Sequence, residues 1–341
     1  MIPFVGLSIV IGGLAFFLYQ KEINKERQEE TLLLEANQSD IEEEPLSSAL
    51  QIDQVRLELG YGLLPLVSET DENYRLTDQI KSLRRQIASE SGFIMPQVRI
   101  QDNLQLPPNS YVVRIKEIEV GSSDIRPNRL LVMDASGDTI DLPGTETIEP
   151  TFGLPAMWVD PDNREEATFK GYTVVDPATV ITTHLTELIR DNMSELLSYV
   201  ETQNLLDELP NEHQKLVGEV VPNQISVGGI QRVLQNLLNE RVSIRDLPTI
   251  LEGISEACAF TRNVTQLTEH VRSRLARQIS EQNSTEDNFI PLVTLSAEWE
   301  QIFSDSILDQ GEDKQLSMAP SQLQRFILSL IHISEPTRRS M

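Results

Sequence analysis

The chain is short of cysteine, histidine and basic residues, and each shortage excludes a class of function. Cys258 is the one cysteine among 341 residues, so no disulfide can form within the chain, as expected in a reducing compartment. The four histidines are scattered, and none has the spacing to cysteine that a zinc site requires. We therefore predict neither a metal site nor a cofactor, and we interpret Cys258 as a buried structural thiol.

Basic residues are outnumbered by acidic ones, 28 Lys and Arg against 53 Asp and Glu, which gives a formal net charge of −25. Nucleic-acid phosphates require a basic surface, so we predict no nucleic-acid partner. Three short predicted helices between Ser226 and Gln278 are similar to a helix-turn-helix bundle, but the acidic charge of the chain argues against DNA binding. The acidic surface leaves two interpretations open, a merely solvated surface and one that attracts basic or amphipathic partners.

Catalytic motifs are also missing. The sequence contains neither the phosphate-binding loop of nucleotide hydrolases nor the G-x-S-x-G elbow of serine hydrolases. Thr182, Thr183 and His184 combine nucleophile and base types, but neighbouring residues of a helix point in different directions. We interpret His184 as a histidine on a helix face and predict no catalytic residue. A membrane-tethered hydrolase that depends on His184 remains the alternative.

The chain begins with an uncharged run over 2–19, close to the ~20 residues that cross a bilayer. Basic residues follow this run at Lys21, Lys25 and Arg27. Their position favours a membrane helix over a cleaved signal peptide and places its C-terminal end in the cytoplasm. We predict a transmembrane helix over 1–20, a linker over 21–50 and a cytoplasmic region after it.

The region after residue 50 begins with alternating strands and helices. Alternation over Asp53–Gly60 predicts a strand, and helical spacing over Thr77–Ser91 predicts an amphipathic helix. A strand over 111–120 follows, and this order of elements predicts a small α/β subdomain. We expect a strand over 171–175, with the helix after it, to return to this subdomain.

The predicted fold class is α+β with several subdomains behind one N-terminal transmembrane helix: a small α/β unit with a β-rich insertion, a helical bundle and a truncated α/β unit. Its segments are 51–122 with 168–192 for the α/β subdomain, 123–167 for the inserted β-rich subdomain, 193–280 for the helical subdomain, and 281–327 for the start of a truncated C-terminal subdomain. In the helical subdomain, Ser226 and Ser243 are placed to cap helices. The last segment, 328–341, contains LSLIHISEPTR and resembles a translated sequencing adapter, so we interpret it as an artefact.

Several stretches, taken in order, resemble the FHIPEP family of type III export-gate proteins. The stretches are LGYGLLPLV over 59–67, VRIQDNL over 98–104, GYTVVD over 171–176, THL over 183–185, VLQNLL over 233–238 and VSIRDL over 242–247. The resemblance extends over roughly Ser47–Gln278. The form QNLL over 235–238 is more similar to the flagellar branch than to the injectisome branch, which stays the alternative.

The resemblance implies a membrane-embedded component of the flagellar export gate in the bacterial inner membrane, of which this chain carries the last membrane helix and the cytoplasmic domain. In the family, the cytoplasmic domain forms a homo-oligomeric ring that docks export chaperone–substrate complexes for proton-driven export. The implied partners are these complexes, other export-gate membrane proteins, the export ATPase complex and further copies of the chain. A purely structural ring scaffold remains a rival interpretation.

The resemblance also implies a chaperone- and substrate-binding groove between the first two subdomains. The family's groove positions correspond to Glu149, Phe152, Val175, Val180 and Thr183. Family members commonly have Asp where this chain has Glu149. The residues alone leave two interpretations of Phe152, an exposed anchor between Pro150 and Gly153 or ordinary core packing. By the same reasoning Val175 and Val180 would be core residues.

Overall fold

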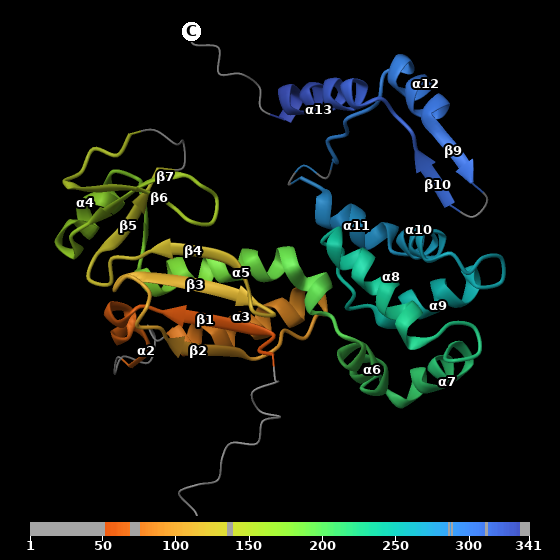
Figure 1. The fold of residues 1–341 in the computed structure, drawn as a ribbon, viewed down its shortest axis with the longest axis horizontal. Helices are drawn as coiled ribbons and strands as arrows, with labels where there is room; N and C mark the ends of the chain where they lie inside the picture. Colours follow the sequence, from red (N-terminus) through yellow and green to blue (C-terminus); the bar gives the residue numbers. More distant parts are fainter. Residues whose placement is uncertain are drawn as a thin grey trace, which may run out of the picture. The chain divides into compact units, whose positions relative to one another are not determined.

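The computed structural model describes residues 52–68, 76–134, 139–285, 287, 289–310 and 313–334. The predicted transmembrane helix over 1–20 and the linker over 21–50 lie outside the described residues, as do residues 335–341 of the adapter-like segment. Among the described residues, no helix combines the length and the apolar character needed to cross a membrane. The described part is a mixed α/β structure, which confirms the predicted fold class (Figure 1).

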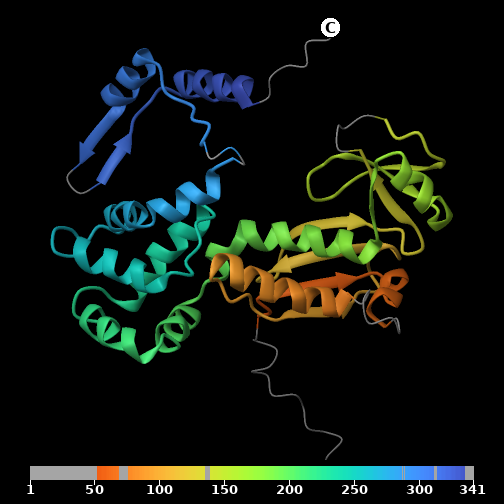
Figure 2. The ribbon, with the colours of Figure 1, turned by 180° about the vertical axis from the view of Figure 1, so that it is seen from behind.

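The first sheet has the strand order β2-β1-β3-β4. Its strands are β1 (Val55–Leu59), β2 (Val98–Asp102), β3 (Ser110–Ile115) and β4 (Ile118–Asp124). β1 runs parallel to β2 and antiparallel to β3, because helix α3 (Leu76–Ser91) makes the crossover from β1 to β2. Helix α5 (Pro177–Leu196) lies beside α3, and both cover one face of this sheet (Figure 2).

The second sheet has the order β6-β7-β5-β8, and all of its pairings are antiparallel. Its strands are β5 (Leu130–Met133), β6 (Gly144–Ile148), β7 (Pro155–Val159) and β8 (Thr173–Val175). The strand predicted over 171–175 is therefore β8, and it pairs with β5 of this sheet, whereas the sequence placed it with the first subdomain. Local alternation identifies a strand but not its neighbour.

Side chains on the two faces of the second sheet enter different cores, as the two-residue period of a strand requires. Leu131, Ala156 and Trp158 join the main core of the protein. Residues from the other face pack in a smaller cluster with Ala167 of α4 (Arg164–Phe169). The sheet is therefore held between the main core and α4.

Helices dominate the chain after α5. They are α6 (Tyr199–Asp207), α7 (Asn211–Val220), α8 (Val227–Asn239), α9 (Leu247–Ala257), α10 (Val264–Arg274) and α11 (Ala276–Asn283). The Ser226 side chain caps α8 as predicted, accepting a bond from Gly229 N at 3.2 Å. The cap of α9 is Asp246 and not Ser243. Further along lie α12 (Ala297–Ser306), β9 (Ile307–Gln310), β10 (Asp313–Leu316) and α13 (Pro320–Ser334).

The helical part shares its core with the first sheet. One continuous cluster of buried apolar residues extends from Val55 in β1 to Leu275 after α10. Polar bonds tie α8 to the end of α5: Gln235 Nε2 donates to the carbonyl oxygens of Ser194 and Leu197 at 3.0 and 3.1 Å. The amide of Gln235 therefore satisfies carbonyl groups that the last turn of α5 leaves without a helical partner.

Candidate partner-binding site

Phe152 is an exposed aromatic residue on the loop between β6 and β7. Its side chain is 65 % exposed, and the apolar side chains of Ile148 and Leu154 beside it are also exposed. The chain turns at Gly153, whose φ of +68° lies in the left-handed region that glycine adopts without strain. The structure thus places Phe152 at the surface and not in the core.

The buried side chain of Glu149, which is only 4 % exposed, supports this loop. Its two carboxylate oxygens accept hydrogen bonds from the backbone N–H groups of Thr151 and Phe152 at 2.8 and 2.7 Å. Its own backbone exchanges bonds with Leu154 and Gly153 at 2.9 and 3.1 Å. Glu149 therefore fixes the backbone that presents Phe152 and offers little surface to a partner.

A buried hydrogen-bonded pair belongs to the same neighbourhood. Tyr111 of β3 is fully buried and His184 of α5 is 7 % exposed, and Tyr111 Oη lies 2.6 Å from His184 Nδ1. The two rings meet edge to face, with centroids 5.8 Å apart. The sequence interpretation of His184 as a helix-face residue missed this contact, because Tyr111 stands 73 positions earlier in the chain.

Burial and the charge of Glu149 determine the protonation of this pair. Burial lowers the pKa of His184, and the negative charge of Glu149 partly opposes that shift. Burial also raises the pKa of Tyr111, and Glu149 raises it further. Both side chains are therefore neutral near pH 7.

The other predicted groove residues lie at different depths. Val175, at the end of β8, is half-buried, whereas Val180 in the first turn of α5 is only 2 % exposed and belongs to the main core. Thr183 is half-buried and lines a hollow of about 430 Å³ between α5 and α3, together with Gln79 and Gln86. The structure thus brings Phe152, Val175 and Thr183 toward the surface and leaves Glu149 and Val180 as supports beneath it.

The start of α5 is fixed by local bonds. Asp176 caps the helix: its carboxylate accepts bonds from the backbone N–H and the hydroxyl of Thr179 at 3.0 and 2.6 Å. Pro177 follows in the first turn, where a backbone N–H has no helical acceptor. These bonds set the direction in which α5 leaves β8 and so place Val180, Thr183 and His184.

The described residues give no support to a metal site or to a hydrolase built on His184. No group of three or more His, Cys, Asp or Glu residues in the described part is placed to hold a metal ion. The Thr182 hydroxyl bonds to the carbonyl oxygen of Ala178 and to Oε1 of Gln79, each at 2.8 Å, while His184 bonds to Tyr111. Burial raises the pKa of the Cys258 thiol, with the charge of Arg262 opposing, which disfavours the reactive thiolate.

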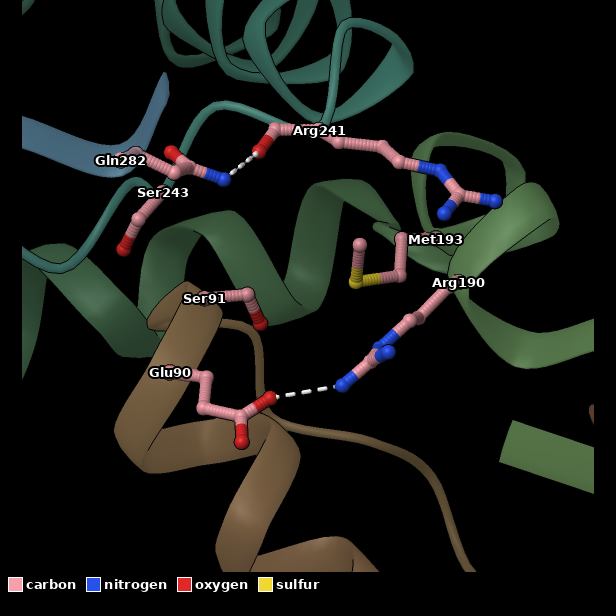
Figure 3. Close-up of a pocket in the computed structure, with 7 residues that line it drawn as sticks. All are labelled: Glu90, Ser91, Arg190, Met193, Arg241, Ser243 and Gln282. Carbon is pink, nitrogen blue, oxygen red and sulfur yellow. Dashed lines mark hydrogen bonds and ion pairs between the residues drawn. The ribbon is translucent and has the colours of Figure 1, made fainter. Parts of the chain in front are cut away.

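A second hollow, of about 260 Å³, lies where the end of α3 meets α5 and the helical part (Figure 3). Glu90 of α3 forms an ion pair with Arg190 of α5 at 2.8 Å, and Gln282 Nε2 donates to the carbonyl oxygen of Arg241 at 3.2 Å. Arg241 also pairs with Asp191 at 2.6 Å. Both arginines that line this hollow are therefore occupied by carboxylates, so it is better described as a junction than as a ligand site.

Comparisons with known proteins agree with this fold. The model of the FHIPEP family matches residues 1–340. Flagellar biosynthesis protein FlhA of Caulobacter vibrioides is 51 % identical over 325 residues, which cover 95 % of this chain and 46 % of that protein. The chain thus spans about half the length of this curated relative.

Solved structures resemble the described part at lower identity. The CdsV protein of Chlamydia pneumoniae superimposes with a TM-score of 0.74 at 25 % identity, covering 83 % of each chain. The nonameric EscV cytosolic domain from the type III secretion system superimposes with a TM-score of 0.64 at 22 % identity, covering 85 % of this chain and 84 % of that one, and shows the fold alone. On the extent of the family match and the identity to FlhA, the chain belongs to the FHIPEP family.

Proposed function

We propose that the chain is part of the flagellar type III export gate and that its cytoplasmic ring docks export chaperone–substrate complexes on the loop that carries Phe152. The observation that carries the proposal is an exposed phenylalanine whose backbone is fixed by the buried carboxylate of Glu149. A rigid, exposed aromatic side chain loses little conformational freedom on binding and is a common anchor of protein interfaces. The site is a binding site, and we propose no reaction for it.

The flagellar branch is supported by the 51 % identity to FlhA over nearly the whole chain. The alternative, a gate of the injectisome type, is supported by the likeness to CdsV and EscV. Their sequence identity to this chain is lower, at 25 % and 22 %. A ring of several copies is supported by the nonameric assembly of EscV. We further propose that the chain is anchored in the bacterial inner membrane through 1–20 and works with other gate proteins and the export ATPase complex.

The net charge of −25 supports a second part of the proposal. Long-range attraction by an acidic surface accelerates encounters with basic partners and orients them, and this effect weakens as salt is added. The final contact is apolar and does not depend on salt in this way. We therefore expect the acidic surface to set the rate of association and Phe152 to set the lifetime of the complex.

The decisive test compares two exposed phenylalanines of the same part of the chain. The full chain is immobilised, and purified flagellar chaperone–substrate complexes are titrated against wild type, Phe152→Ala and Phe169→Ala. Phe169, at the end of α4, is 93 % exposed and serves as the matched control. We expect Phe152→Ala to weaken binding about tenfold or more, as for an interface hot spot, and Phe169→Ala to bind as wild type does.

Circular dichroism of each variant establishes that the fold is kept. Equal affinities of wild type and Phe152→Ala would contradict the proposed site. Absence of binding by folded wild type, with ring assembly intact, would instead support the structural scaffold. A preference for injectisome chaperone complexes in the same titration would decide for the alternative branch.

A further inference from the structure

We infer that the outer edge of β6 takes up an extended peptide segment of the docked partner as an added strand, beside the loop that carries Phe152. The inference rests on the proposed function of that loop and states the chemistry of the segment that binds next to it. In the described part β6 is the terminal strand of the second sheet and pairs with β7 alone. Its other edge therefore presents backbone groups that no strand of the described part meets.

The hydrogen-bond pattern shows which backbone groups of β6 point outward. Glu149 N donates to Leu154 O at 2.9 Å, in the pair directly after the last pair of the β6–β7 ladder. Bonded and non-bonded pairs alternate in an antiparallel ladder, so every second residue before Glu149 bonds to β7. The N–H and C=O groups of Glu146 and Ile148 therefore point away from β7. Groups of this kind are matched best by the backbone of another extended chain.

The other sheet edges of the described part have features that hinder strand addition. The β3–β4 ladder contains a register shift, β8 has only three residues, and β2 carries the basic side chain of Arg99. Bulges, short strands and charged side chains are common means of protecting an edge. β6 keeps a regular register over five residues and contains no proline and no basic residue. It is therefore the edge best suited to accept a strand.

The exposed side chains of β6 indicate which segment would bind. Glu146 and Ile148 lie on the same face of the sheet, as the two-residue period requires, and both are exposed. On an added strand, Glu146 favours a basic side chain directly opposite, and Ile148 favours an apolar one. The net charge of −25 attracts a basic segment as well. We therefore expect an extended segment with a basic and an apolar residue two positions apart.

This edge is continuous with the proposed site. β6 ends at Ile148, and the loop that exposes Phe152 begins at the next residue. A segment paired along β6 would therefore bring its following residues to the exposed phenylalanine. Strand addition would supply backbone bonds that depend little on the partner's sequence, and Phe152 would supply the apolar anchor.

A second copy of the chain fits this edge less well. Two copies of β6 paired antiparallel about their middle residue would place Glu146 opposite Glu146. Like charges directly opposite one another destabilise a sheet. The side chain that discourages this self-pairing is the same one that favours a basic residue on a partner.

The experiment measures hydrogen exchange and affinity for the full chain and the same chaperone–substrate complexes. Exchange of the Glu146 and Ile148 amides is followed by mass spectrometry at single-residue resolution, with and without the complexes. Glu146→Pro removes an outward N–H where an edge strand tolerates proline, whereas Glu146→Ala keeps the N–H and removes the carboxylate. Asp102→Pro on the edge of β2 is the matched control: its N–H also points outward, because Asn103 N donates to Leu59 O of β1 at 2.9 Å.

We expect the bound complexes to slow exchange at Glu146 and Ile148 about tenfold and to leave Asp102 unchanged. Glu146→Pro should weaken binding about fivefold or more, because a backbone bond is lost and the proline ring occupies the place of the partner strand. Glu146→Ala should weaken binding only about twofold, since an exposed pair of opposite charges contributes little. Asp102→Pro should bind as wild type does.

The outcomes separate this inference from the proposed function. If Phe152→Ala loses binding while Glu146→Pro binds as wild type does and exchange at β6 is unchanged, the inference is wrong and the proposed function stands. If Phe152→Ala binds as wild type does, the proposed function fails, and the exchange data still decide whether β6 accepts a strand.

Two further outcomes concern folding and the identity of the added strand. Should circular dichroism show that Glu146→Pro does not fold, exchange in wild type decides, and unchanged rates at Glu146 and Ile148 overturn the inference. Exchange that slows at these two residues with rising protein concentration, in the absence of complexes, would make a second copy the occupant and would overturn the proposed one.

Discussion

His184 carries an ionisable ring into the core, and its protonation is therefore linked to folding. Burial lowers its pKa below the ordinary value of 6.5, with Glu149 opposing. In the unfolded chain the ring titrates near that ordinary value, so on the acid side the unfolded state binds more protons than the folded state. The free energy of unfolding must then fall as the pH drops from the unfolded pKa toward the folded one, and the contribution is fully present above the unfolded pKa.

A denaturation series tests this linkage at a single residue. We expect wild type to lose more free energy of unfolding than His184→Asn between about pH 7 and about pH 5.5 in urea titrations. His213→Asn should keep the slope of wild type, since His213 is a surface residue of α7. Parallel slopes for wild type and His184→Asn would show that the buried ring does not take up its proton on unfolding.

At the scale of elements, helix caps show which local bonds the fold uses. Asp246 precedes α9, and its carboxylate accepts a bond from Thr249 N at 3.3 Å. Ser243, the predicted cap, stands three residues earlier, and its hydroxyl accepts only a long bond of 3.4 Å from Arg245 N. The two positions thus offer a capping side chain and a neighbouring non-capping one just before the same helix.

The expected stabilities differ accordingly. Asp246→Ala should lower the free energy of unfolding by about 1 kcal/mol, the usual cost of losing an N-cap. Ser243→Ala should change it by only a few tenths of a kcal/mol. Urea denaturation of both variants beside wild type measures the difference, and equal losses would mean that Asp246 contributes no more than a surface serine.

The helices and strands also show which features of the fold could be predicted from the sequence and which could not. Helical spacing correctly predicted the buried face of α8, because that period is local: Ile230, Val233, Leu234, Leu237 and Leu238 are all buried. The pairing of β8 with β5 was missed because strand partners are chosen by tertiary packing. Alternation over Thr173–Val175 is equally compatible with either sheet.

The candidate site likewise depends on contacts that local sequence patterns do not reveal. The exposure of Phe152 depends on a turn that Glu149 caps, and only the family resemblance favoured it over core packing. Tyr111 and His184 lie 73 positions apart, so no local pattern could have joined them. The binding role of the groove residues stays a prediction, and what the structure adds is their depth.

At the scale of the whole described part, the shared core predicts cooperative unfolding. Buried residues from β1 through α10 form one continuous cluster that includes Trp158 of β7. Across the junction, Ile244 N donates to Ser91 O at 2.8 Å, and Arg190 pairs with Glu90 (Figure 3). Elements that share buried surface to this extent gain stability from one another and should unfold together.

We therefore expect a single unfolding transition for the sheets and the helices after α5. In a Trp299→Phe variant, fluorescence reports on Trp158 alone, and circular dichroism at the helical band reports mainly on the helices. The midpoints in urea should coincide, because loss of either part exposes the core of the other. Two separated midpoints would show that the second sheet unfolds independently of the helices.

The bonds by which Glu149 fixes its loop do not depend on which side chains the loop exposes. Both bonds that its carboxylate accepts come from backbone N–H groups, and every amino acid except proline supplies such a group at positions 151 and 152. The side chains at positions 151 and 152 can therefore be exchanged while the support remains in place, whereas Gly153 is held by its positive φ. Under the proposed function, partner preference would then reside in two exchangeable positions, which can diversify without changes to the scaffold that carries them.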